Sequence, residues 1–375
     1  MDEKSHLAAA WEQGTMRIAF VSDSIYPYNK GGKENRLYEI ARRLAKRGHD
    51  VHIYCMKWWG GPKKVKQYGV TLHGISPYFP LYNKEGKRSM KQAIGFALYV
   101  LPGLLAQRFD ILDVDQMPYF PVFPAWIVSK LKRKPMVVTW HEHWGNYWYE
   151  YLGKKGAIGW LVERLSEMFT PRAIVVSKHT AQRLHTRPMH IIPNGIDVQA
   201  IDDVEPSKKH YDILFAGRLI YHKNVDLLIQ VANKKGYKTL IIGTGPEEKR
   251  LRRMAKKNIH FQGFSRDQST VFAQMKSAKA FVYLSEREGF GIALLEALAC
   301  GTPVITSNKK HNAGKSLIRQ GYNGYICSLT ESDVENAIDL CLKNNAQMKA
   351  HAAASAKGYD WDAIVDKIER VYAHE

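Results

Sequence analysis

The sequence predicts an α/β protein with two doubly wound domains, each a parallel sheet alternating with helices. Two observations lead to this prediction. Short, mostly apolar runs, such as residues 16–22, are typical of buried parallel strands, and they alternate along the chain with segments of helical character. The chain has 375 residues, which is long enough for two domains that each bury a sizeable core.

The first domain is predicted to span residues 16–205. Residues 1–15 differ in character from the rest of the chain, and we expect them to be a disordered leader or tag. The domain opens as a βαβ unit, with a strand at 16–22, a helix at 33–47 and a strand at 51–56. No G-x-G-x-x-G follows the first strand, so this is not a dinucleotide fingerprint. Later strands are predicted at residues 109–114, 135–140 and 171–177, and helical stretches at 117–131, 158–168 and 178–184.

The second domain is predicted to span residues 206–358, after a polar linker at 198–210. A final helix at 359–375 is expected to cross back to the first domain. Strands are predicted at residues 211–218, 239–243, 260–264, 280–284 and 304–306. Helices are predicted at residues 225–234, 251–257, 269–277, 292–300, 332–342 and 347–356, and a helix and turn at 314–326.

The stretch from Ser285 to Pro303 carries the strongest chemical signal. Its glycine loop feeds the N-terminus of a helix rich in Ala and Leu, where free N–H groups and the helix dipole favour an anion such as a phosphate. Glu288 precedes that helix and Glu296 lies within it, and carboxylates accept hydrogen bonds from sugar hydroxyls. The spacing alone fits a phosphate and sugar site about as well as an ordinary strand–loop–helix corner with solvated glutamates.

This stretch closely resembles the E-x7-E region of retaining GT-B glycosyltransferases, in particular glycosyltransferase family 4. In that family the first Glu lies at the donor sugar and the second binds the nucleotide ribose. The resemblance therefore assigns these roles to Glu288 and Glu296. It also implies that the intervening loop and helix start bind the donor, through Gly289, Phe290, Gly291 and Ile292.

Further motifs of the same family follow in order along the second domain. Gly217, Arg218 and Lys223 resemble its G-R-L-x-x-x-K element, whose two cations would stabilise the charge that gathers on a departing diphosphate. Gly243 begins a string that resembles the G-x-G-P loop. Gly263 and Phe264 resemble the turn whose backbone contacts the nucleotide base.

Four residues of the first domain match the family as well. Gly31 and Gly32 resemble the glycine loop that passes close to the donor phosphates and the acceptor, although a plain turn is the alternative. His141 follows a predicted strand at its carboxyl end, where ligands gather in such sheets, and it matches the family's His that faces the donor sugar. Asn194 belongs to a string that resembles IPNGID, which closes the first domain near the cleft.

The resemblance implies a GT-B fold, with two Rossmann-like domains facing across a cleft. It implies a retaining glycosyltransferase that moves a sugar from a nucleotide diphosphate sugar to an acceptor hydroxyl. The catalytic residues would be Arg218, Lys223, Glu288 and His141. No metal and no cofactor beyond the donor substrate are expected, in agreement with the absence of a D-x-D motif.

The charge of the chain points to an anionic partner. Lys and Arg total 55 against 36 Asp and Glu, a net charge of +19. Residues 83–108 are basic at first, with Lys84, Lys87, Arg88 and Lys91, and apolar afterwards. With Trp58 and Trp59 this segment is predicted to lie on an anionic membrane, although a core helix with a solvated basic cap is equally compatible. Pro102 argues against one uninterrupted helix.

These observations favour a lipid-linked or cell-envelope glycan as the acceptor, at the cytoplasmic face of the cell membrane. The longest apolar run has 14 residues, too few for a span, and four scattered cysteines fit a reducing compartment. Two alternatives remain. The charge would suit a nucleic-acid-binding protein, but no module signature is present, so no nucleic acid is expected. A non-catalytic GT-B scaffold is disfavoured by the intact motifs.

Overall fold

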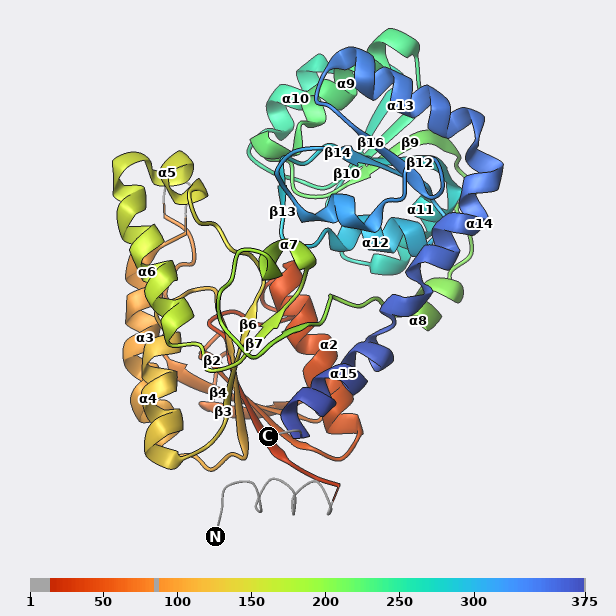
Figure 1. The fold of residues 1–375 in the computed structure, drawn as a ribbon. Helices are drawn as coiled ribbons and strands as arrows, with labels where there is room; N and C mark the ends of the chain where they lie inside the picture. The colour runs from red at the N-terminus through yellow and green to blue at the C-terminus, as the bar shows by residue number, and fades with distance from the viewer. Residues whose placement is uncertain (1–13, 84–87, 374–375) are drawn as a thin grey trace. The chain divides into compact units, whose positions relative to one another are not determined.

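The computed structural model describes residues 14–83 and 88–373, which form two compact units (Figure 1). The first unit runs to Pro193 and includes the chain again from Asp362, whereas the second comprises Asn194–Trp361. Nearly all of the expected leader, and Lys84 and Lys87 of the basic segment, lie outside the described residues.

An eight-stranded sheet forms the centre of the first unit, in the order β3-β4-β2-β1-β5-β6-β7-β8. Its described neighbours pair in parallel, except that β3 and β4 are antiparallel. The inner strands are buried because helices cover both faces, which explains their continuous apolar sequences. The strands are β1 (Arg17–Val21), β2 (Asp50–Met56), β3 (Lys64–Gln67), β4 (Val70–Ser76), β5 (Ile111–Asp115), β6 (Met136–Trp140), β7 (Ala173–Val175) and β8 (Met189–Ile191).

The helices of the first unit divide between the two faces of this sheet (Figure 1). One face carries α2 (Gly32–Lys46) and α15 (Trp361–Ala373), and the other carries α3 (Met90–Leu105), α4 (Val122–Lys132) and α6 (Gly156–Met168). Leu37, Ile40 and Leu44 of α2 are buried, as their helical spacing predicts. Shorter helices are α5 (Tyr147–Leu152), η1 (Gly153–Lys155) and α7 (Lys178–Ala181).

The second unit holds a six-stranded parallel sheet in the order β11-β10-β9-β12-β14-β16. Its strands are β9 (Tyr211–Ala216), β10 (Thr239–Ile242), β11 (Ile259–Gly263), β12 (Ala278–Tyr283), β14 (Val304–Ser307) and β16 (Gly324–Cys327), and a small separate pair joins β13 (Arg287–Glu288) to β15 (His311–Asn312). In Figure 1 one face carries α9 (Val225–Lys235), α10 (Glu248–Met254) and α13 (Glu331–Lys343), and the other carries α11 (Gln268–Ser277), α12 (Ile292–Ala299) and α14 (Asn345–Ala356). The short helices are α8 (Val198–Asp202), η2 (Tyr221–Lys223), η3 (Ala313–Leu317) and η4 (Lys357–Tyr359).

The division between the units falls earlier than the predicted boundary at residues 205 and 206, and residues 359–361 stay with the second unit. The reason is that backbone hydrogen bonds join Ile196 to Tyr359 and Trp361. The amide of Ile196 donates to the carbonyl of Tyr359 at 2.8 Å, and the amide of Trp361 donates to the carbonyl of Ile196 at 3.0 Å. From Asp362 onward, α15 belongs to the first unit, where Arg47 pairs with Asp366 at 2.7 Å.

The expectation that Pro102 interrupts the helix in the apolar segment of the first unit was wrong. Helix α3 continues through Pro102, which has no N–H to donate to the carbonyl group one turn earlier. Because Pro102 is exposed in the last turn of the helix, water can bind that carbonyl group instead. Trp58 is partly buried, because its indole donates to the carbonyl of Asp23 at 2.9 Å and its ring packs on the core of the first unit. No helix within the described residues is both long enough and apolar enough to cross a bilayer.

Candidate active site

Three of the predicted donor-binding glycines lie at the carboxyl edge of the second sheet: Gly217 and Gly243 follow β9 and β10, and Gly263 ends β11. The amide of Gly217 donates to the carbonyl of Ile242 at 2.9 Å, and the amide of Gly243 donates to the carbonyl of Gly263 at 2.8 Å. A Cβ at Gly243, whose φ is +133°, would lie 1.9 Å from the carbonyl oxygen of Gly217. Only glycine fits there, and the lack of side chains leaves room for a ligand to approach the backbone.

Gly245 is a fourth glycine of this edge, which the sequence analysis did not single out. A Cβ there would lie 2.2 Å from the carbonyl oxygen of Leu219. The loop after β10 therefore packs directly against the backbone of the loop after β9. The second glycine of the G-x-G-P string is the signal that could have identified it.

The predicted catalytic residues Lys223 and Glu288 form an ion pair, although 65 residues separate them. Lys223 ends η2, is 8% exposed, and also donates to the hydroxyl of Tyr283 at 2.7 Å. Burial alone would lower the pKa of Lys223, but the neighbouring Glu288 carboxylate outweighs it and the pKa is raised. Burial and the Glu288 charge together raise the pKa of Tyr283 to about 12. Lys223 is therefore a fixed cation, and Tyr283, which sequence reasoning missed, is a neutral hydroxyl that orients it.

Arg218, the second predicted cation, directly follows Gly217 and is exposed. The two cations therefore differ in exposure, because Lys223 is buried. An exposed guanidinium next to the glycine edge can reorient toward an anion, with several donors in a planar fork.

The short β13–β15 pair fixes the loop that carries Glu288. Glu288 lies opposite Asn312 in that pair, and Asn312 is fully buried. The Asn312 amide donates to Thr306 Oγ1 at 3.0 Å, and its oxygen accepts from the amide of Gly314 at 3.0 Å. No motif in the sequence pointed to Asn312, because its role depends on pairing with a distant segment.

Helix α12 places the second glutamate of the predicted pair. Its N-cap residue, Gly291, has a φ of +93°, and a Cβ there would lie 3.1 Å from Gly314 Cα, so the glycine allows both the turn and the close approach. Glu296 lies within α12 and accepts a hydrogen bond from the Gln268 amide at 2.8 Å. Burial raises the pKa of Glu296 to about 7, although the bond from Gln268 opposes the rise.

The remaining predicted donor residues of the second unit differ in exposure. Phe290 is buried, with its ring 6.1 Å from that of Tyr359, so only its backbone is available to a ligand, whereas Phe264 is 57% exposed. Asn194 is buried in the segment that links the two units. The glycine beside it is explained by packing, because a Cβ at Gly195 would lie 2.6 Å from the ring of Trp361.

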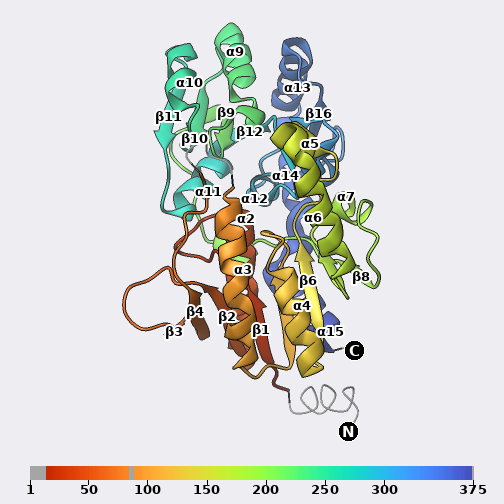
Figure 2. The same ribbon diagram turned by 90° about the vertical axis from the view of Figure 1, so that its left-hand side faces the viewer.

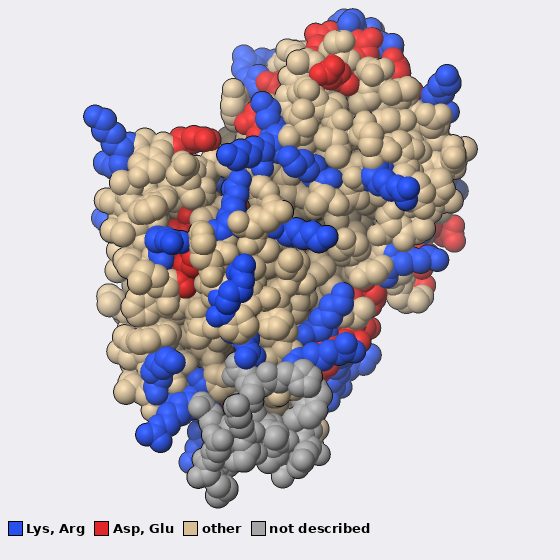
Figure 3. Space-filling view, viewed as in Figure 1, with Lys and Arg blue, Asp and Glu red and all other residues tan. Residues whose placement is uncertain are grey.

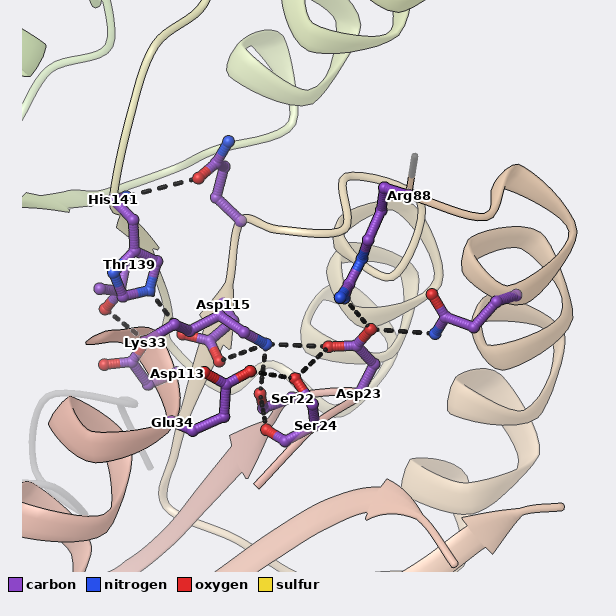
Figure 4. A network of polar contacts seen from close by, with 12 residues as sticks. Ser22, Asp23, Ser24, Lys33, Glu34, Arg88, Asp113, Asp115, Thr139 and His141 are labelled. Carbon is purple, nitrogen blue, oxygen red and sulfur yellow. Dashed lines mark hydrogen bonds and ion pairs between the residues drawn. The ribbon is translucent and has the colours of Figure 1, made fainter. Parts of the chain in front are cut away.

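In the first unit, His141 belongs to a charged network at the carboxyl ends of β1, β5 and β6 (Figure 4). Its Nε2 lies 2.9 Å from Oδ1 of Asp115, the last residue of β5. Burial would raise the pKa of Asp115, but the Lys33 charge and the His141 bond outweigh it and lower the pKa to about 2. Since the ionised carboxylate only accepts hydrogen bonds, Nε2 of His141 is the donor, and the ring is held in one orientation.

Lys33 connects this pair to the loop after β1 (Figure 4). Its Nζ lies 2.8 Å from Asp23 Oδ1 and 3.4 Å from Asp115 Oδ2. Asp23 is fully buried and also pairs with Arg88. Burial opposes its ionisation, but the charges of Lys33 and Arg88 outweigh that effect and lower its pKa. Sequence reasoning missed these roles of Asp23, Lys33 and Asp115; the available signal was that both carboxylates lie at strand ends.

The predicted glycine loop of the first unit is not a left-handed turn. Gly31 has extended backbone angles and is the N-cap residue of α2, and Gly32 is the first residue of that helix. A Cβ at Gly31 would come within 2.3 Å of the carboxylate of Glu34. Because that carboxylate is the end of a flexible side chain that can shift, neither the backbone angles nor the packing requires glycine at residue 31.

Comparisons with known proteins match the chain to glycosyltransferase families over both of its units. The model of the family "Glycosyl transferases group 1" matches residues 197–361, and that of "Glycosyltransferase Family 4" matches residues 30–200. Among curated proteins, the phosphatidyl-myo-inositol mannosyltransferase of Mycobacterium leprae is 31% identical over 95% of this chain and 96% of its own.

Solved structures show the same fold. Sucrose-phosphate synthase from Thermosynechococcus elongatus superposes with a TM-score of 0.78 at 17% identity, over 96% of this chain and 98% of that one. Anabaena HepE in complex with UDP-glucose gives a TM-score of 0.72 at 18% identity, over 96% and 100%. The predicted GT-B fold is thus confirmed, and the protein is a glycosyltransferase that belongs to the glycosyl transferases group 1, with a first domain of glycosyltransferase family 4.

Proposed function

We propose that the protein transfers a sugar from a nucleotide diphosphate sugar to an acceptor hydroxyl, with retention of configuration and without a metal ion. The observation that carries the proposal is the buried Lys223–Glu288 pair. It lies on the same unit as the glycine edge formed by residues 217, 243 and 263. A fixed cation and an open backbone suit a diphosphate, and a carboxylate suits the hydroxyls of a sugar.

The leaving diphosphate would be stabilised by the protein alone. As the bond between the anomeric carbon and the phosphate oxygen breaks, negative charge gathers on the diphosphate, where Lys223 and Arg218 would neutralise it. The acceptor oxygen bonds to the anomeric carbon on the same face, and its proton passes to the departing phosphate oxygen. Glu288 would hold sugar hydroxyls. Identifying the first product anomer by nuclear magnetic resonance would test retention.

Two further residues would position the donor. Glu296 would accept hydrogen bonds from the two ribose hydroxyls. Binding would favour the ionised form of Glu296, because both oxygens of a carboxylate act as acceptors. His141 would contact a sugar hydroxyl through Nδ1, because Nε2 is engaged by Asp115. The donor is the substrate, and the proposal includes no further cofactor.

The acceptor would be a lipid-linked or cell-envelope glycan at the cytoplasmic face of the cell membrane. This is supported by the M. leprae relative, whose name gives phosphatidyl-myo-inositol as the molecule that receives mannose. The net charge of +19 is consistent with an anionic membrane surface.

A thermal-shift panel of UDP, GDP, ADP and their sugar conjugates, with and without EDTA, tests the donor site. A nucleotide at about a hundred times its Kd stabilises the folded state by about 2.7 kcal/mol, which raises Tm by several degrees. We expect one of the nucleotides to give this shift, and EDTA should not change it. The Glu296→Ala variant should not show the shift. A Glu335→Ala variant, which changes a carboxylate at the surface of α13, is the matched control and should retain the shift. No shift from any nucleotide would contradict the proposal.

A further inference from the structure

Three helices of the first unit lie on one side of its sheet (Figure 2), and large apolar side chains on them are exposed. They are α3, α4 and α6, and both views place them on the same side of the sheet. The end of α6 is packed against α4, since the ring of Phe169 lies 5.3 Å from that of Phe123 and 4.9 Å from that of Trp126. We call this surface the apolar helix face.

The exposed side chains of this face are long and aliphatic or aromatic. Leu98 of α3 is 71% exposed, Leu131 of α4 is 67% exposed, and Met168 of α6 is 74% exposed. Most of the exposed large hydrophobic residues among the described part of the chain lie on these three helices. A contiguous apolar surface of this kind marks an interaction site rather than ordinary solvent-facing surface.

Helix α3 is apolar on both sides, whereas α6 carries apolar side chains mainly on its outer side. On α3, Phe96, Val100 and Leu104 are fully buried against the sheet, whereas Ile94 and Leu98 face outward. On α6, the exposed positions 158, 161, 165 and 168 follow helical spacing along one side. Because α3 is apolar on both sides, it needs an apolar environment on both, and the sheet supplies only one.

The charges of these helices are sorted by sign. Neither α3 nor α4 contains Asp or Glu, and the two glutamates of α6 point inward. Glu163 is 1% exposed and accepts from the Tyr119 hydroxyl at 2.7 Å, and Glu167 is 5% exposed. Lys91, Lys130 and Arg164 are exposed, and of these Arg164 also pairs with Glu167 at 2.9 Å. The corresponding left-hand margin of Figure 3 is mainly tan, with Lys and Arg side chains at its upper and lower ends.

We propose that the apolar helix face docks on an anionic lipid surface, with α3 and α6 lying in the interface. Apolar side chains would enter the acyl boundary, and the exposed cations would meet lipid head groups. A second copy of the chain fits the face less well, because a two-fold contact would bring the same cations against one another. The inference deepens the proposed function, on which it rests for the presence of an acceptor at a membrane.

Vesicle flotation tests the docking directly. The probes are vesicles of phosphatidylglycerol and phosphatidylcholine, and of phosphatidylcholine alone, at low and high salt. The triple variant Leu98→Glu, Leu131→Glu, Met168→Glu places one carboxylate on each helix. The matched control is Leu340→Glu, which changes an exposed leucine on α13 of the second unit.

We expect the unaltered protein and Leu340→Glu to float with anionic vesicles at low salt and less at high salt. The triple variant should lose at least tenfold in partitioning, and Lys91→Ala should lose about fivefold. Equal flotation of the triple variant, or no preference for anionic vesicles, would overturn the proposal. So would light scattering that shows a dimer for the unaltered protein, a monomer for the triple variant and no flotation for either.

Failure of the docking and failure of the proposed function give different results. The nucleotide-induced thermal shift reports on the donor residues of the second unit, and the three substitutions lie in the first. A retained shift without flotation would refute only the docking. Flotation without any nucleotide shift would refute only the donor site. An unchanged far-ultraviolet circular dichroism spectrum and urea unfolding curve of the triple variant would show that its first unit is folded.

Discussion

Replacing Lys223 by Met tests the central charge of the site while keeping most of the side-chain volume. The substitution removes the hydrogen bond to the Tyr283 hydroxyl and the ion pair with Glu288, whose side chain is 14% exposed. A hydrogen bond to a charged group contributes about 1.5–3 kcal/mol, so we expect the second unit to lose about 2–3 kcal/mol of stability. The loss in the transition state should be larger, about 2.7–4 kcal/mol, because the cation acts on charge that develops as the diphosphate leaves.

The assay is release of nucleoside diphosphate from the donor that the thermal-shift panel identifies, with unfolding in urea measured in parallel. Turnover should fall about a hundredfold or more, and equally across neutral pH because the raised pKa keeps Lys223 charged. Adding Glu288→Gln should recover part of the lost stability but no turnover, since it removes the unpaired carboxylate. Lys235→Met, which changes a partly exposed lysine paired with Asp339, is the control and should stay within about 0.5 kcal/mol. Turnover of Lys223→Met within a few-fold of the unaltered protein would refute the diphosphate assignment.

Three further changes test other parts of the site. Gly243→Ala places a Cβ 1.9 Å from a carbonyl oxygen, so it should lower stability by more than about 2 kcal/mol and abolish the nucleotide shift, whereas Gly358→Ala, which meets open space, should do neither. Folding raises the pKa of Glu296 from 4.5 to about 7, so the contribution of this residue to stability falls as pH rises through that range. Relative to the unaltered protein, Glu296→Gln should therefore be more stable at pH 8 than at pH 5, by about 1–2 kcal/mol in urea unfolding. A stability difference that does not change with pH would contradict this. Asp115→Asn should cost about 1–3 kcal/mol in thermal or urea unfolding, because a buried acceptor of Lys33 loses its charge, and an unchanged Tm would argue against that pairing.

The features that could be predicted from the sequence are those that depend on residues close together in the chain. Buried parallel strands require continuous apolar residues, and α2 requires apolar spacing on one side, so both were predictable from composition and period. The glycines at 243 and 291 were identified by the motifs to which they belong, and their positive φ angles explain why glycine stands there. The motif order, together with these elements, was sufficient to predict the GT-B fold, which the comparisons confirm.

What the sequence alone could not provide depends on contacts between distant segments. The pairing of Asn312 with the Glu288 loop, and the joining of Asp23 and Asp115 by Lys33, arise only when separate strands end at the same edge of a sheet. The same holds for the apolar helix face, because the sequence of each helix shows apolar residues but not which of them the sheet covers. The sequence thus determined the elements, the fold and the candidate donor residues, whereas tertiary packing decided which charges are paired, which pKa values shift and which apolar side chains remain exposed.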